Sequence, residues 1–445
     1  MTLAAGDFAQ LLLAVGLLLG SAHAVGHLFT LARQPRVIGE IMGGLLLGPT
    51  VLGALAPELQ ATLFPSEGPV AAVLGWNYQI GLLLLMFASG AEMRSVFRRG
   101  ETRVVGLVTV VGVVLPFVAG LLLFRVIDSS SLLGVAQNDT ALLLVFGLAI
   151  AVTSIPVISR IMFDLGIIET PFARIVLGVA VIEDIIVYVV LALALGMVAS
   201  GGGEEVGVPG LLGLEQGSSA SMAFHVSATL VFFVLVLTLG PRSFRWSRRQ
   251  RWNLVASSNP IAYHLLFIFG GTLVCVMLGI TPMFGAFLAG IAASIGRGPQ
   301  VTQARESIKS FSFAFFIPLY FAIVGLQLDL IRHFNVLFFA WFLLFACVAK
   351  AASVYLGARL AGESPRGSRN LAVATNARGG PGIVLASVSY AAGIISQEFF
   401  AALVMLAIVT SLLAGSWLGH VVRTRQPLRD EPASRPATSE APVRG

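Results

Sequence analysis

Two adjacent carboxylates, Glu183 and Asp184, lie in the apolar stretch VIEDIIVYVV of residues 181–190. The run from Ile175 to Ala199 contains no other charged residue. Charged side chains inside a membrane span are costly and usually functional. A carboxyl group in low-dielectric surroundings can hold a proton near neutral pH, because its charged form is disfavoured there. The stretch therefore predicts an ion-binding or proton-binding site within the membrane.

Two basic residues, Lys350 and Arg378, also lie within apolar segments. Consecutive residues on a helix point about 100° apart, so Glu183 and Asp184 cannot both face one partner. We expect one acid to meet Lys350 while the other faces a water-filled cavity. This arrangement disfavours a carboxylate pair that shares a proton, as in aspartic proteases. An ion pair that only fixes helix packing is the plainer alternative, but it needs just one acid.

Two of the apolar segments are interrupted by polar and helix-breaking residues near their middle. Proline removes a backbone donor from the helical ladder, and unwound backbone at membrane depth is tolerated only in a cavity or packed in protein. Two such breaks, seven helices apart, predict inverted repeats around a midplane site. The residues of the two breaks are Thr153, Ser154 and Pro156 in the first, and Asn376, Arg378, Gly379, Gly380, Pro381 and Gly382 in the second.

The composition places these segments in a membrane protein. The chain is 57% hydrophobic and 11% charged, whereas a soluble domain is about 25% charged. Since a spanning helix needs about 20 mostly apolar residues, the pattern predicts an all-α membrane protein with about thirteen transmembrane helices. The expected ranges are 8–31, 38–55, 70–93, 103–126, 140–162, 172–199, 222–240, 260–279, 282–296, 310–328, 335–358, 369–392 and 397–421.

The basic residues predict the orientation of these spans. With the N-terminus outside, every Lys and Arg falls in an inside connection or the tail, except four: Arg125, Arg332, Lys350 and Arg378. Cytoplasmic loops carry such an excess, so the net charge of +6 indicates topology and not nucleic-acid binding. We expect a transmembrane exchanger domain over 1–421 and a short disordered cytoplasmic tail over 422–445, in a bacterial inner membrane.

Several other classes of protein are disfavoured. The first ten residues carry Asp7 and no Lys or Arg, which favours an uncleaved first span over a signal peptide. Cys275 and Cys347 lie in apolar runs, as buried hydrophobic residues do. No glycine-rich phosphate loop is present, which argues against ATP-driven pumping. The chain has no HExxH or serine–histidine arrangement, so we expect neither an enzyme nor a bound cofactor.

Seven stretches, taken together, resemble the monovalent cation/proton antiporters, in the branch of bacterial Na+/H+ exchangers, glutathione-gated K+ efflux systems and plant cation/H+ exchangers. They run in order over the second to the twelfth expected helix. The stretches are RQPRVIGEIMGGLLLGPTVLG (33–53), AVTSIPVISRIMFDLG (151–166), GVAVIEDIIVYVVLALAL (178–195), TPMFGAFLAGIAAS (281–294), FFIPLYFAIVGLQLDL (315–330), ACVAKAASVYLGARL (346–360) and NARGGPGIVLASV (376–388).

The resemblance implies roles for the charged residues. Asp184 matches the acid that binds the cation, Na+ or K+, and in exchange the proton. Lys350 matches the basic residue that pairs with the position of Glu183, and Arg378 matches a basic residue of the crossover that can compensate helix-end dipoles. Glu183 stands where several electrogenic exchangers carry Asp and other branches carry Asn or Gln. Because it is one carbon longer than Asp, the number of protons exchanged per cation stays open.

The resemblance also implies a fold and a mechanism. Thr153, Ser154 and the second break match two crossed, unwound helices beside the ion. A homodimer is expected, with a core domain that moves against a fixed dimerisation domain. The expected activity is secondary antiport of a monovalent cation against protons by alternating access. The alternatives are a Na+-coupled symporter of a small organic anion and a leaky uniporter. The 445 residues hold no counterpart of the soluble C-terminal domain of the K+ efflux systems, so we do not expect nucleotide or glutathione control by that route.

Overall fold

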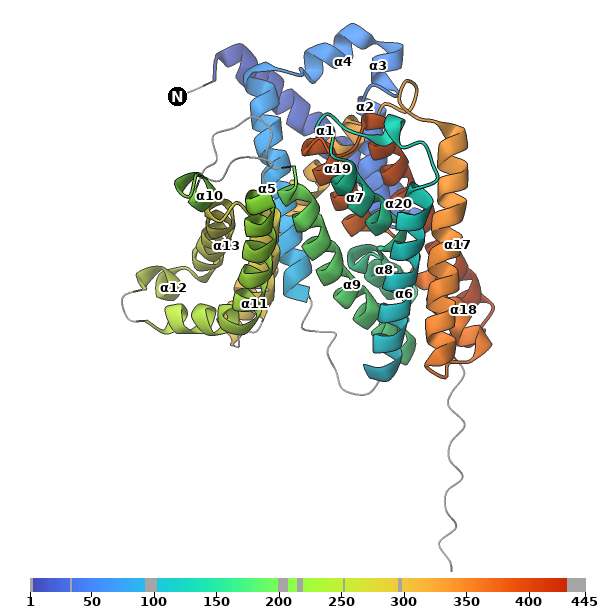
Figure 1. Cartoon of the computed structure of the whole chain (residues 1–445). Helices are drawn as coiled ribbons and strands as arrows, with labels where there is room; N and C mark the ends of the chain where they lie inside the picture. The colour runs from blue at the N-terminus through green and yellow to red at the C-terminus, as the bar shows by residue number, and fades with distance from the viewer. Residues whose placement is uncertain are drawn as a thin grey trace, which may run out of the picture.

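The computed structural model describes residues 3–32, 34–92, 102–198, 207–213, 219–250, 253–294 and 298–429. The secondary structure of these residues is helical apart from one isolated bridge between Leu133 and Ile395. The expectation of an all-α protein is therefore confirmed. The helices form two bundles that lie side by side (Figure 1).

The first bundle packs around the contacts of α5 with α14 and of α2 with α1 and α16. Small residues let these helices approach closely, as is common in membranes. Gly44 of α2, for example, lies directly against the main chain of Ala322 in α16. The members of this bundle are α1 (Ala5–Leu31), α2 (Arg36–Leu47), α5 (Gly68–Glu92), α11 (Ser219–Arg249), α13 (Pro260–Met277), α14 (Pro282–Ser294), α15 (Pro299–Phe311), the π-helical turn Ser312–Phe316 and α16 (Ile317–Leu326).

The second bundle contains both interrupted segments and the two acids. Its helices pack mainly through α6 with α17, α6 with α7, and α19 with α20. The two bundles meet where α9 contacts α11 and where α19 contacts α2. The members of the second bundle are α6 (Thr102–Phe124), α7 (Asp139–Ala151), α8 (Ile155–Asp164), α9 (Pro171–Gly196), α17 (Val336–Leu360), α18 (Pro365–Ala374), α19 (Gly379–Ala391) and α20 (Gln397–Arg423).

Short helices connect these elements near the ends of the bundles. Figure 1 shows α3 and α4 at the top and α12 at the lower left of the molecule. The short elements are α3 (Leu52–Leu55), α4 (Pro57–Leu63), the 3-10 turn Ser130–Leu132, α10 (Val208–Leu211) and α12 (Leu254–Ser258).

Within the described ranges, nine helices are long and apolar enough to cross a membrane, or ten if a bent pair within α11 counts as one span. Two shorter apolar helices, α7 and α14, fall below that length. The halves of the interrupted segments and α14 occupy the remaining expected ranges. The multi-pass character is thus confirmed, while the count of thirteen crossings stays a prediction.

Several expected boundaries were wrong, because polar residues continue helices beyond their apolar part. The helix expected at 222–240 runs over Ser219–Arg249, and the one expected at 310–328 begins at Pro299. Arg305 and Lys309, assigned to a connection, therefore lie on helix α15. Hydropathy detects the apolar core of a helix but not its polar ends.

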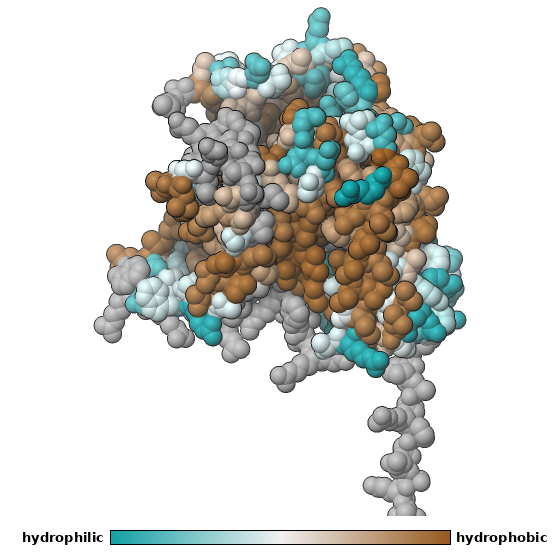
Figure 2. Space-filling model, viewed as in Figure 1, coloured by the Kyte–Doolittle hydropathy of each residue, from teal (hydrophilic) through white to brown (hydrophobic). Residues whose placement is uncertain are grey.

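The surface carries an apolar band around the middle of the molecule. Figure 2 shows hydrophobic residues across the centre and hydrophilic residues towards the top and bottom. Large apolar side chains on the surface include Leu12, Leu235 and Leu344, each more than 40% exposed. Because exposed apolar surface of this extent needs lipid or a partner, the band supports a protein surrounded by membrane.

The segment after α20 folds back on the second bundle. The Arg429 guanidinium forms two hydrogen bonds with the Glu363 carboxylate, at 2.5 and 2.8 Å. Asn370 of α18 also donates to the Leu428 carbonyl at 3.0 Å. Residues 430–445, most of the tail expected to be disordered, lie outside the described residues.

Candidate functional site

Two interrupted helices cross inside the second bundle. Helix α7 ends at Ala151 and α8 begins at Ile155, so residues 152–154 are not helical. Helix α18 ends at Ala374 and α19 begins at Gly379. The Ser154 amide donates to the Ala377 carbonyl at 2.7 Å, which joins the two unwound segments directly. The crossed, broken helices expected from the sequence are thus present in the structure.

Side chains of the first segment strengthen this crossing. The Thr153 hydroxyl donates to the Thr375 carbonyl at 2.5 Å. The Ser154 hydroxyl accepts the Gly380 amide at 3.0 Å. Both residues are buried. The structure therefore places the two hydroxyls, expected to bind an ion, in hydrogen bonds that hold the other segment.

The prolines of the breaks lie in the first turns of the second half-helices. Pro156 is the second residue of α8, and Pro381 is the third residue of α19. Proline is tolerated there because the first amides of a helix have no partner within the helix. Inside an uninterrupted helix, each proline would instead remove a backbone hydrogen bond. The prolines therefore favour a break in each segment and start the helix that follows.

Gly379 allows the crossing to close, and its substitution gives a direct test. A Cβ atom at this position would lie against Val157 and 2.7 Å from the Ser154 hydroxyl oxygen. We expect Gly379→Ala to destabilise the protein by about 1–3 kcal/mol through overpacking. Thermal unfolding in detergent should show a lowered midpoint. Gly75→Ala is the matched control, since a Cβ atom there meets nothing within 4 Å; equal midpoints for the two variants would contradict a close-packed crossing.

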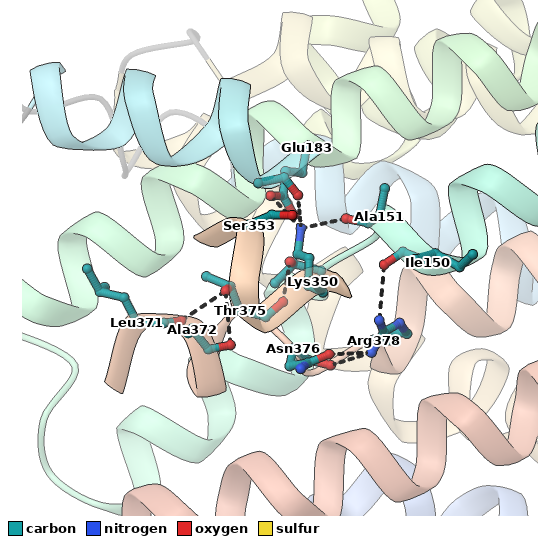
Figure 3. A network of polar contacts seen from close by, with 12 residues as sticks. Ile150, Ala151, Glu183, Lys350, Ser353, Leu371, Ala372, Thr375, Asn376 and Arg378 are labelled. Atoms are coloured by element: carbon teal, nitrogen blue, oxygen red, sulfur yellow. Dashed lines mark hydrogen bonds and ion pairs between the residues drawn. The ribbon is translucent and has the colours of Figure 1, made fainter. Parts of the chain in front are cut away.

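Lys350 joins three helices at the crossing. Its ammonium group donates to the Glu183 carboxylate at 2.8 Å, to the Ala151 carbonyl at 2.5 Å and to the Gly112 carbonyl at 3.0 Å. Lys350 and Glu183 are both fully buried. Figure 3 shows Lys350 between Glu183 and Ala151, at the C-terminal end of α7. Three acceptors match the three N–H groups of an ammonium ion.

Arg378 binds carbonyl groups and forms no ion pair within the described part of the chain. It donates to the carbonyls of Ala149 and Ile150 at 3.0 Å each, and to that of Ala346 at 2.8 Å. It also donates to the side-chain oxygen of Asn376 at 2.5 Å (Figure 3). A cation at the C-terminal end of α7 compensates the partial negative charge there. Arg378 therefore stabilises an interrupted helix end.

Asp184 has different surroundings from its neighbour. The residue is fully buried, and neither carboxylate oxygen receives a hydrogen bond from the described residues. Glu183 points to Lys350 from the adjacent position on α9. Since buried polar atoms are nearly always paired, two orphaned oxygens on one carboxylate favour a binding site for a proton or a cation.

Among the described residues, no group of three His, Cys, Asp or Glu side chains is placed to hold a metal ion. Asn376 lies in the second break and donates to the Cys347 carbonyl at 3.0 Å, so it links α17 to the crossing.

Two further buried polar groups are not evident from the sequence pattern. Glu40 lies within the expected range 38–55, is buried, and pairs with Arg36 at 3.1 Å. The buried Tyr188 hydroxyl lies one turn after Asp184 on the same helix. The charge of Glu40 inside an apolar range could have drawn attention to it. A tyrosine in a spanning helix has no such signal.

Comparisons with known proteins agree with this geometry. The transmembrane domain of the sodium/hydrogen exchangers matches residues 14–424. The Na+/H+ antiporter NhaS4 of Synechocystis is 29% identical over 412 residues, which cover 89% of this chain and 93% of that protein. Cation/H+ antiporter 20 of Arabidopsis thaliana is 28% identical over 447 residues, which cover 97% of this chain and 51% of that protein. The chain thus spans about half the length of this plant relative.

A solved structure shows the same fold. The sodium proton antiporter MjNhaP1 from Methanocaldococcus jannaschii superimposes with a TM-score of 0.60 at 14% identity, over 94% of this chain and 99% of that one. Crossed helix breaks, buried acids and a match over nearly all the helices lead to one conclusion: this chain belongs to the sodium/hydrogen exchanger family, whose members are membrane transporters and not enzymes.

Proposed function

We propose that this chain is a secondary active antiporter that exchanges a monovalent cation, Na+ or K+, for protons by alternating access. One observation carries the proposal: Asp184 is a fully buried carboxyl group whose oxygens have no hydrogen-bond donor among the described residues. Such a group is stable when it binds a proton or a dehydrated cation. Proton and cation then compete for one site. Exchange follows if the empty, charged site cannot switch from one side of the membrane to the other.

The crossing supplies the surroundings of this site. Thr153 and Ser154 hold the unwound segments together, and their hydroxyl oxygens retain lone pairs that can contact an ion. Lys350 compensates the negative charge of Glu183, and Arg378 compensates the partial negative charge at the C-terminal end of α7. Occupancy of Asp184 would bias which side of the membrane the site faces. We assign the movement to the second bundle, which meets the first through few contacts.

The ion pair supports electroneutral exchange. All three N–H groups of Lys350 have acceptors, and its Glu183 partner is fully buried. Such a pair is most stable with both groups charged, because breaking it leaves a buried charge unpaired. We therefore propose that Glu183 and Lys350 stay paired through the cycle, so that one cation exchanges for one proton.

Electroneutral exchange predicts insensitivity to membrane potential. In proteoliposomes with Na+ as the transported cation and no K+ present, a potential imposed with a gradient of the permeant anion thiocyanate should leave the initial rate of proton movement unchanged within about twofold. The same vesicles without protein correct for passive leak. A rate that rises or falls steadily with the imposed potential would show net charge transfer and contradict a fixed ion pair.

The orientation of the spans in the membrane is inferred from the positions of the basic residues. We propose an N-terminus outside and a C-terminus in the cytoplasm of a bacterial inner membrane, supported by the basic residues at one end of the spans. A homodimer is proposed from the family resemblance and the exposed apolar surface of the first bundle. The comparisons give the symporter alternative no support.

Cation-driven proton movement tests the proposed function. Purified protein in sealed vesicles with an internal pH dye should move protons when Na+ or K+ is added, with a rate that saturates. Saturation separates an antiporter from a channel. Proton movement that requires an added organic anion would instead indicate the symporter.

A further inference from the structure

Tyr188 carries a polar group that the helix packing does not explain. Its side chain is 1% exposed, and the hydroxyl has no hydrogen-bond partner among the described residues. Leaving a buried hydroxyl unpaired is unfavourable, whereas a phenylalanine would fill the same space without that cost. A tyrosine at this position therefore indicates a partner other than the neighbouring side chains.

Tyr188 and Asp184 lie on one face of α9, since they are four residues apart. Long side chains on a helix lean back towards its N-terminus, which brings the ring of Tyr188 towards Asp184. Asp184 and Tyr320 both lie near enough to the Tyr188 hydroxyl to act on it electrostatically. The orphaned oxygens of Asp184 and the orphaned hydroxyl of Tyr188 thus belong to one buried region.

This region lies where the two bundles meet. The Tyr188 ring packs against Phe287 of α14, with 4.7 Å between the ring centroids. Beyond it, Tyr320 of α16 shares a hydrogen bond of 2.8 Å with Ser387 of α19, so its hydroxyl has a partner. Among the buried tyrosine hydroxyls of the described ranges, only that of Tyr188 lacks a hydrogen-bond partner. An ion bound here would lie close to the boundary between the two bundles.

We propose that the Tyr188 hydroxyl is a second binding group for the transported monovalent cation, opposite Glu183 and beside Asp184, and that it contributes to the choice between Na+ and K+. A hydroxyl oxygen offers a neutral lone pair of the kind that replaces the hydration shell of an alkali cation. The inference rests on the proposed function and adds a residue to its site.

The test is Tyr188→Phe in proteoliposomes, which removes the hydroxyl and keeps the ring on Phe287. The cation concentration for half-maximal exchange should rise at least about fivefold, which corresponds to the loss of one neutral contact. The rise should be larger for one of the two cations, Na+ or K+, than for the other. The maximal rate should stay within twofold of the wild type. Tyr263→Phe is the control, because that hydroxyl bonds Ser247 and the Phe244 carbonyl away from the site.

Two results would overturn the inference. Unchanged half-saturation for both cations would exclude the hydroxyl as a ligand, and a lower maximal rate at unchanged half-saturation would assign it to the movement instead. Thermal unfolding without cation gives an independent check: an equal or higher midpoint in Tyr188→Phe supports an unpaired hydroxyl, and a clearly lower one contradicts it. If the wild-type protein moves no protons with either cation, that result contradicts the proposed function itself and not the role of Tyr188.

Discussion

Asp184→Asn is expected to abolish cation-driven proton exchange while the protein remains folded. The amide has the volume of the carboxyl group, but it neither releases a proton nor carries the charge that a buried cation needs. A buried charge without its counter-ion costs about 3–5 kcal/mol, so cation affinity should fall more than about 100-fold. The measurement is the initial rate of proton movement in proteoliposomes at several Na+ and K+ concentrations.

The matched control for this variant is Asp139→Asn. Asp139 is exposed at the first residue of α7 and lies outside the site, so its exchange rate should equal that of the wild type. Exchange that persists in Asp184→Asn, in protein with a normal thermal unfolding midpoint, would remove Asp184 from the mechanism.

Lys350→Met is expected to have the largest effect on stability. It removes the partner of the fully buried Glu183 and the donor to the carbonyls of Gly112 and Ala151. Breaking a buried ion pair by removing one side costs about 3–5 kcal/mol. We expect a strongly lowered unfolding midpoint in detergent, together with loss of exchange.

The double variant Lys350→Met with Glu183→Gln separates charge from packing. Removing both charges should restore most of the lost stability, since a neutral pair of similar volume can be accommodated. A double variant as unstable as Lys350→Met alone would show that the carbonyl contacts of Lys350, and not the ion pair, determine its contribution.

Hydropathy and helix breakers predicted much of the fold. Apolar runs placed the helices, because a spanning segment must satisfy its backbone internally and face lipid. Polar residues at Thr153 and Ser154, and glycines before Pro381, located both breaks of the crossing. The 100° spacing of adjacent residues predicted that Glu183 and Asp184 would have different surroundings, and the structure turns Glu183 alone to Lys350.

The sequence could not supply contacts that depend on how distant segments meet. Nothing in the stretch around Arg378 indicates that its acceptors are Ala149 and Ile150, more than two hundred positions away. The carbonyl acceptors of Lys350 are equally remote. The unpaired hydroxyl of Tyr188 becomes visible only when every neighbour is known. Helix ends extended beyond prediction because charged residues such as Arg305 continue α15 outside the apolar region.

The central claim, that one proton and one cation compete for Asp184, can be measured directly as proton release on cation binding. Solubilised protein in weakly buffered solution is titrated with Na+ or K+, and the released protons are counted with a pH dye. About one proton per bound cation is expected for the wild type, and none for Asp184→Asn. Cation binding without proton release in the wild type, or undiminished release in Asp184→Asn, would contradict the account.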